Sequence, residues 1–180
     1  YGCVEKFLQT DADYLVVLED DLRIDNNFSS TLQEILHYLH SQKNIEWSLI
    51  NIAAKKNKIS REIFRTHDYS LVRAYYFPIR GVGLVWSRQG AHDFLKMAQN
   101  PCLPVDIFFQ NWLIKNGKGL SIWPPLVRPA GLDSDILGTV ATERVRRKQK
   151  ENRDFSFFMK KQLRLLKNNI LAYINFLLFK

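Results

Sequence analysis

The sequence Tyr14-Leu-Val-Val-Leu-Glu-Asp-Asp-Leu-Arg-Ile-Asp25 places three consecutive acids directly after a wholly apolar run. A short apolar run bounded by polar residues is typical of a parallel strand that is covered on both faces. It predicts a strand over Tyr14–Leu18, with Glu19, Asp20 and Asp21 at its carboxyl end. Because ligands of open α/β sheets bind beyond the carboxyl ends of the strands, these acids are the first candidates for a functional site.

Strand and helix patterns alternate along the rest of the chain. Apolar spacing predicts helices up to residue 10 and over 31–39, 88–99 and 105–116, and strands over 47–52, 71–77, 81–86 and 120–123. The polar and basic residues 55–69 are expected to form a loop. Strands that alternate with helices predict an α/β layered fold.

Local signals indicate where several of these helices begin and end. Thr31 and Glu34 have the spacing of a capping box, which predicts a helix start at Thr31. Ser87 is expected to cap the helix that follows it. Asp106 lies in the first turn of the next predicted helix, and Gly117 is expected to end that helix.

The composition is that of a globular chain whose charge is unevenly distributed. Apolar residues make up 46% of the 180 residues, and the two cysteines are too few for a disulfide framework. Residues 1–142 carry 15 basic and 15 acidic side chains, whereas residues 143–180 carry 11 basic and 3 acidic ones and thus the whole net charge of +8. A neutral body argues against nucleic acid as its partner, and the basic tail is expected to bind an anionic surface.

The three acids after the first strand have two interpretations. Side chains alternate in an extended segment, so Glu19 and Asp21 are expected to point one way and Asp20 the other. Two converging carboxylates can hold Mg²⁺ or Mn²⁺, with phosphate oxygens and water at the remaining positions. The alternative is an acidic turn that is hydrated at the surface or paired with Arg23.

Further motifs follow the acidic one in an order that resembles glycosyltransferase family 25, the lipopolysaccharide or lipooligosaccharide galactosyltransferases. Besides the acids within residues 15–22, the resemblance rests on the segment from Arg80 to Ala91, on Leu103-Pro-Val-Asp106, and on residues 124–127 with Ser134-Asp135-Ile136. Together these motifs cover roughly residues 1–137. The resemblance implies a GT-A-like, Rossmann-like mixed sheet with flanking helices. With the charge distribution, it predicts a partial catalytic domain over 1–142 and a basic amphipathic tail over 143–180.

The resemblance also implies an activity. Members transfer a hexose, usually galactose from UDP-galactose, with inversion, here to lipopolysaccharide or lipooligosaccharide core. Glu19 and Asp21 would hold Mn²⁺ or Mg²⁺, which neutralises the diphosphate as UDP leaves. Such an ion would also remove the repulsion among the neighbouring acids.

A further carboxylate is needed to take the proton of the acceptor hydroxyl. Asp106 is the leading candidate, although an Asp in a first helical turn is favoured by the helix dipole alone. Asp133 and Asp135 are alternatives for catalysis or for the metal shell. The candidates for substrate binding are Asp20, Arg80, Asp133 and Arg128. Trp86, Trp112 and Trp123 are more often core residues than sugar platforms, and His37 and His40 lack a third zinc ligand.

The chain differs from the family pattern in its first residues. A family segment Gly-Cys-x-x-Ser-His appears here as Gly2-Cys-Val-Glu-Lys-Phe7, and the preceding strand–helix unit of the nucleotide pocket is absent. The chain has no initiator Met and is expected to be an interior piece of a longer protein. Two alternatives to the transferase therefore stay open. One is a truncated, inactive homologue that binds sugar or membrane only, and the other is a phosphodiesterase or nuclease that uses the same acids.

The basic tail contains a predicted helix over residues 159–180. Its apolar side carries Met159, Leu163, Leu166, Ile170, Ile174 and Leu177. The apolar stretch within it is about half the ~20 residues that span a bilayer, so we expect an interfacial helix held by anionic lipid. This placement suits a lipid-linked oligosaccharide acceptor at the cytoplasmic face of a bacterial inner membrane. The alternatives are a last helix that packs on the domain, or an RNA-binding tail.

Overall fold

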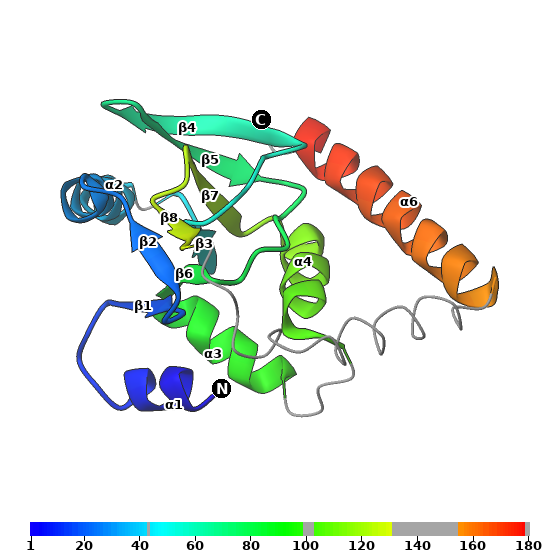
Figure 1. The fold of residues 1–180 in the computed structure, drawn as a ribbon, viewed down its shortest axis with the longest axis horizontal. Coiled ribbons are helices and arrows are strands. Elements are labelled where there is room, and N and C mark those ends of the chain that lie inside the picture. The colour runs from blue at the N-terminus through cyan, green and yellow to red at the C-terminus, as the bar shows by residue number, and fades with distance from the viewer. Residues whose placement is uncertain (43, 99–102, 131–154, 179–180) are drawn as a thin grey trace.

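The computed structural model describes residues 1–42, 44–98, 103–130 and 155–178 (Figure 1). Its strands are β1 (Tyr14–Leu18), β2 (Leu22–Ile24), β3 (Leu49–Asn51), β4 (Ser60–Thr66), β5 (Tyr69–Ala74), β6 (Gly83–Ser87), β7 (Gly119–Trp123) and β8 (Val127–Pro129). Its helices are α1 (Gly2–Leu8), α2 (Phe28–Ser41), α3 (Arg88–Met97), α4 (Val105–Asn116) and α6 (Phe155–Leu178). The predicted α/β class with a mixed sheet is confirmed.

Six strands form the central sheet in the order β1-β6-β3-β7-β5-β4, and β2 pairs with β8 in a separate ribbon. β1 and β3 are both antiparallel to β6, while β3 and β7 are parallel. The carboxyl ends of β1, β3 and β7 therefore lie at the same end of the sheet. Glu19, which follows β1, and the residues that follow β3 lie at this same end of the sheet, with the start of β6 between them.

The bounds predicted for β1 are confirmed, but its predicted environment is wrong. β1 is the edge strand of the sheet and pairs antiparallel with β6 alone, from Tyr14 opposite Ser87 to Leu18 opposite Gly83. Val16 is 38% exposed and Leu18 is 36% exposed, so one face of the strand is open to solvent. An apolar run alone does not distinguish this arrangement from a central parallel strand.

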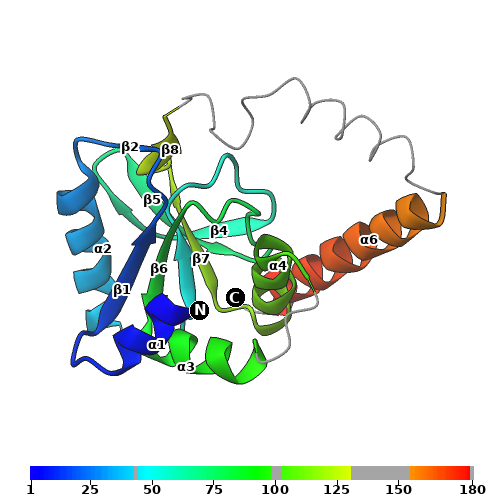
Figure 2. The same ribbon diagram turned by 60° about the horizontal axis from the view of Figure 1, so that its bottom comes forward.

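Helices cover both faces of the sheet (Figure 2). On one face, α1, α3 and α4 pack on a core that includes Leu84 and Trp86 of β6. On the other face, α2 packs on a core that includes Val85 of the same strand. This alternation along β6 is the period of two that a central strand requires. Trp86 and Trp112 are buried core residues, as the simpler interpretation of the aromatics predicts, but Trp123 is 41% exposed and that interpretation is wrong for it.

The helix signals and the loop prediction have mixed outcomes. Ser87 caps α3 by accepting a hydrogen bond from the Gly90 N–H at 3.0 Å, and Gly117, with φ of 67°, ends α4. The capping-box prediction at Thr31 is wrong, because α2 begins three residues earlier and Thr31 is buried within it. The loop predicted over residues 55–69 contains β4, an edge strand whose charged side chains hide its strand pattern.

α6 packs on the domain next to α4 (Figure 1). Its contact face carries Asn168, which donates to Asn111 at 2.9 Å, and Asn175, which donates to the Ile114 carbonyl at 2.6 Å. Ala172 lies between them and is fully buried. Among the helices that the structure describes, none combines the length and apolar character needed to cross a bilayer.

Candidate active site

Glu19 lies at the end of β1, where the strand pairing with β6 continues for one more residue. Its backbone N–H donates to the Val82 carbonyl at 3.0 Å. Partial burial raises the pKa of the Glu19 carboxyl, and the negative charges of Asp21, Asp106 and Asp20 raise it further. The structure therefore brings Asp106, from a distant part of the sequence, close to the three consecutive acids.

Asp106 is held in place by the segment that leads into β6. The Gly81 N–H donates to the Asp106 carboxylate, which lowers the pKa of that carboxyl. The larger effect is burial, which raises the Asp106 pKa above its usual value. A Cβ atom at Gly81 would lie 2.5 Å from Asp106 Oδ1, so the backbone approaches the carboxylate more closely than a side chain allows.

Asn51 fixes the same segment from the end of β3. It is fully buried, and its Nδ2 donates to the Arg80 carbonyl at 2.6 Å. Its Oδ1 accepts a hydrogen bond from the Ala53 N–H at 2.9 Å. The sequence analysis did not identify Asn51, although an amide within the apolar run Leu49-Ile-Asn-Ile52 is a visible signal of a structural role.

The acids are not neutralised by neighbouring basic side chains of the described residues. The ion pairs there are Arg65–Glu62, His67–Glu34 and Lys118–Glu46, and none includes an acid of the β1 end. Arg23 lies on β2 opposite Arg128 of β8, so the two guanidinium groups belong to the small ribbon. Pairing with Arg23, one form of the alternative to a metal site, is not among these ion pairs. The other form, an acidic turn hydrated at the surface, stays open, because Glu19, Asp20 and Asp21 are exposed.

The donor set of the acids fits a hard divalent cation. Among the described residues, no group of three or more His, Cys, Asp or Glu side chains is placed to hold a metal ion. Mg²⁺ and similar ions are, however, often bound by one or two carboxylates together with substrate phosphates and water. The strongest repulsion on Glu19 comes from Asp21 rather than Asp20, as the alternation of side chains predicts.

The remaining predicted site residues are only partly brought together. The Arg80 backbone belongs to the segment held by Asn51, and its side chain lines a neighbouring pocket with three lysines. The charge of Arg128 lowers the pKa of Asp25, which places Arg128 near the start of α2 rather than among the acids. Asp133 and Asp135 lie outside the described residues.

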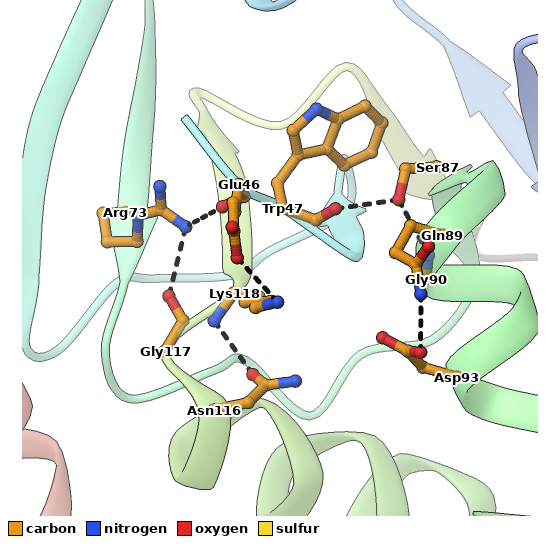
Figure 3. A network of polar contacts seen from close by, with 10 residues as sticks. All are labelled: Glu46, Trp47, Arg73, Ser87, Gln89, Gly90, Asp93, Asn116, Gly117 and Lys118. Carbon is orange, nitrogen blue, oxygen red and sulfur yellow. Dashed lines mark hydrogen bonds and ion pairs between the residues drawn. The ribbon is translucent and has the colours of Figure 1, made fainter. Parts of the chain in front are cut away.

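A second polar network lies at the opposite end of β3 (Figure 3). Arg73 donates to the carbonyl of Glu46 at 2.7 Å and to that of Gly117 at 3.1 Å. Lys118 pairs with the Glu46 carboxylate at 2.7 Å. Because these cations are bound within the network, we interpret it as support for the fold and not as a candidate site.

Comparison with known proteins agrees with these observations. The model of glycosyltransferase family 25, described as an LPS biosynthesis protein family, matches residues 1–109. This match includes the acids after β1, the Gly81 segment and Asp106. Procollagen galactosyltransferase 1 of Danio rerio is 36% identical over 97 residues, which is 52% of this chain and 15% of that protein. The family resemblance inferred from the motifs is confirmed, and the chain belongs to glycosyltransferase family 25.

Proposed function

We propose that this chain is the catalytic region of an inverting, metal-dependent hexosyltransferase with a GT-A-like fold. The proposed reaction moves galactose from a UDP-sugar to lipopolysaccharide or lipooligosaccharide core. Membership of a glycosyltransferase family supports sugar transfer, and the relative is a galactosyltransferase by name. The main support from the structure is that Asp21 and Asp106 lie near enough to Glu19 for their charges to raise its pKa, and that none of these acids has a basic partner among the described residues.

In this proposal, Glu19 and Asp21 hold Mn²⁺ or Mg²⁺. Bound there, the ion would supply positive charge to the diphosphate of the leaving UDP. Asp20, Arg80 and Arg128 are proposed to contact substrate. Asp133 and Asp135, whose positions the structure does not describe, stay candidates for substrate binding and catalysis.

Asp106 is the proposed base. The oxygen of the acceptor hydroxyl bonds to the anomeric carbon while the bond from that carbon to the UDP oxygen breaks. The electron pair of the broken bond leaves with UDP, and the hydroxyl proton passes to an Asp106 oxygen. Burial raises the Asp106 pKa, which makes the carboxylate a better proton acceptor, and the Gly81 N–H fixes its orientation.

Calorimetry with UDP in the presence of Mn²⁺ tests the metal site. The double variant Glu19→Gln, Asp21→Asn keeps the shape of both side chains and removes their charge. We expect it to weaken metal-dependent UDP binding at least tenfold. The matched control Asp11→Asn, Asp13→Asn removes two exposed charges at the other end of β1 and is expected to bind like the wild type. Equal affinity of all three proteins would contradict the proposal.

The same samples distinguish the alternative functions. An inactive homologue would show no metal-dependent UDP binding in the wild-type chain. A phosphodiesterase or nuclease would cleave a phosphodiester substrate in a reaction that depends on Glu19 and Asp21, without transferring sugar. Transfer of radiolabelled galactose to a lipooligosaccharide acceptor is the positive result that the proposal requires.

We further propose that α6 attaches the protein to an anionic membrane surface, at the cytoplasmic face of a bacterial inner membrane where a lipid-linked oligosaccharide acceptor is available. The support is the division of α6 into two faces. The Asn168 face packs on α4, whereas the predicted apolar side is exposed, with Leu163 60%, Leu166 57% and Leu177 67% accessible.

The charge of α6 favours anionic lipid as the occupant of its apolar side. At 100° per residue, Lys160 and Lys167 both lie along one border of that side, and both are exposed. An exposed apolar stripe flanked by lysines is the pattern of a helix that lies in the interface of an anionic bilayer. The alternative, a last helix that packs on the domain, is confirmed by the contacts of Asn168 and Asn175 with α4. The proposed membrane contact would use the opposite face of α6.

A further inference from the structure

A pocket of about 290 Å³ lies next to the candidate active site. Its walls come from the segment after β3, the end of β5 and the segment before β6, α4 and α6. Four cationic side chains line it, namely Lys55, Lys56, Lys58 and Arg80. No acidic side chain is among its lining residues, so the pocket carries concentrated positive charge.

These cations lack acidic partners within the described part of the chain. None of the three ion pairs found there includes a lysine of residues 55–58 or Arg80. The Lys58 ammonium lies 4.5 Å from the centre of the Tyr76 ring, a cation–π contact that leaves its charge uncompensated. Several uncompensated cations that share one concave surface favour the binding of an anion.

A buried hydrogen-bond donor adds to this preference. Tyr76 lines the pocket, is 4% exposed, and its hydroxyl has no hydrogen-bond partner. The buried Nε of Arg164 also has no partner, and the charge of Arg164 acts on the Tyr76 hydroxyl. Arg164 is not among the lining residues of the pocket, so the argument rests on Tyr76. Burying an unpaired donor is unfavourable, so the Tyr76 hydroxyl indicates that a ligand with acceptor oxygens completes the site.

The pocket and the acid cluster share two structural elements. Arg80, in the wall of the pocket, precedes Gly81, whose N–H holds Asp106. Gln110, also in the wall, follows Asp106 by one turn of α4 and donates to the Phe77 carbonyl at 2.8 Å. A molecule that reaches from the pocket to the acids would therefore pass along Arg80 and Gly81.

We propose that this pocket binds an anionic group, a phosphate or a carboxylate, of the acceptor saccharide. The inference rests on the proposed function, which places the donor diphosphate beside Glu19 and Asp21. A second anion site, lined by lysines and by Arg80, then belongs to the acceptor. The proposed enzyme would select acceptors by their negative charge as well as by the hydroxyl that reacts.

Titration with inorganic phosphate, followed by backbone amide NMR shifts, tests the pocket. We expect saturable shifts at residues 54–58 and 80–81 in the wild type. The double variant Lys56→Gln, Lys58→Gln should bind phosphate about tenfold more weakly. The control Lys96→Gln, Lys115→Gln removes two exposed charges outside the pocket and should leave the affinity unchanged. Equal weakening in both variants would overturn the proposal, as would the absence of phosphate binding by the wild type.

A second measurement separates donor from acceptor. The Lys56→Gln, Lys58→Gln variant should retain wild-type affinity for UDP with Mn²⁺, whereas Glu19→Gln, Asp21→Asn should lose it and retain phosphate binding. Loss of UDP affinity in the lysine variant would assign the pocket to the donor diphosphate and overturn the acceptor assignment. A wild-type chain that binds phosphate through the lysines but never binds UDP would instead contradict the proposed transferase.

Discussion

The backbone N–H of Gly81 donates a hydrogen bond to the Asp106 carboxylate, and a Cβ atom at position 81 would lie 2.5 Å from Asp106 Oδ1. This contact joins the segment before β6 to the first turn of α4. It also keeps Asp106 close enough to Glu19 for the charge of Asp106 to raise the Glu19 pKa. The position of one backbone segment therefore determines how the acids of the candidate site are arranged.

The first prediction concerns Gly81→Ala, whose methyl group would displace the Asp106 carboxylate. We expect kcat of galactose transfer to fall by between about tenfold and a hundredfold, because small displacements of a catalytic group have effects of this size. Steady-state kinetics and a thermal melt measure activity and stability separately. The control is Gly2→Ala, where a Cβ atom would meet nothing within 4 Å. Wild-type kcat in Gly81→Ala would exclude Asp106 as the base.

The second prediction concerns Gly90→Ala in α3. Helix propensity alone predicts that alanine stabilises a helix relative to glycine by about 0.5–1 kcal/mol. A Cβ atom at Gly90 would, however, collide with the carbonyl of Ser48, the residue before β3. We therefore expect the opposite sign, a loss of about 1–3 kcal/mol in the free energy of unfolding, measured with urea. A stabilised Gly90→Ala protein would show that α3 does not pack this closely on β3.

The parts of the fold that were predicted correctly depend on local interactions. Ser87 caps α3 with its own hydroxyl, and Gly117 ends α4 through its own backbone conformation, so both signals can be recognised in a few residues. Glu34 shows the limit of this reasoning. It accepts a hydrogen bond from Thr66 on β4 instead of closing a capping box, because a contact formed by the tertiary fold replaced the local one.

The candidate site was predictable to a similar extent. Glu19 and Asp21 follow a strand directly, and Asp106 stands at a helix start, so each is visible in its own segment. That Asp106 lies near Glu19 depends on the path of the chain through β6 and α4, which no local pattern reveals. The basic pocket was missed for the same reason, since Lys58, Tyr76 and Arg164 meet only in the folded chain.

The third prediction concerns the pH dependence of stability at Asp25. Its pKa is lowered first by a hydrogen bond from the Asn27 N–H and then by one from the Tyr69 hydroxyl at 2.7 Å. A lowered folded-state pKa contributes stability above the unfolded-state value of about 3.9, and this stability is lost as the pH falls through the folded-state pKa. Tyr69→Phe should therefore cost about 0.5–1.5 kcal/mol at pH 7, and less below about pH 4.

Urea denaturation across this pH range measures the effect of Tyr69→Phe. The matched control is Tyr173→Phe, which removes a hydroxyl from a side chain that is 58% exposed on α6. We expect the control to match the wild type at every pH. A stability difference for Tyr69→Phe that stays constant from pH 7 to pH 3 would show that the Asp25 charge does not contribute to it.

The fourth prediction concerns the exposed apolar side of α6. Leu166 and Ile170 are 57% and 53% exposed there, so Leu166→Glu with Ile170→Glu should leave the fold intact. Flotation with vesicles of phosphatidylcholine and phosphatidylglycerol should show at least tenfold weaker binding, because two apolar side chains are lost from the bilayer and two negative charges are added. Binding by the wild type should weaken as the salt concentration rises.

The control for this prediction places the same substitutions on other parts of the surface. Ile24 and Met97 are 54% and 46% exposed outside α6, so Ile24→Glu with Met97→Glu makes the same change in charge and hydrophobicity. This control should float with the vesicles like the wild type, because the vesicles are expected to contact α6 alone. If sedimentation instead showed a dimer that only the α6 substitutions dissociate, with no vesicle binding by the wild type, a second copy of the chain would be the occupant of this face.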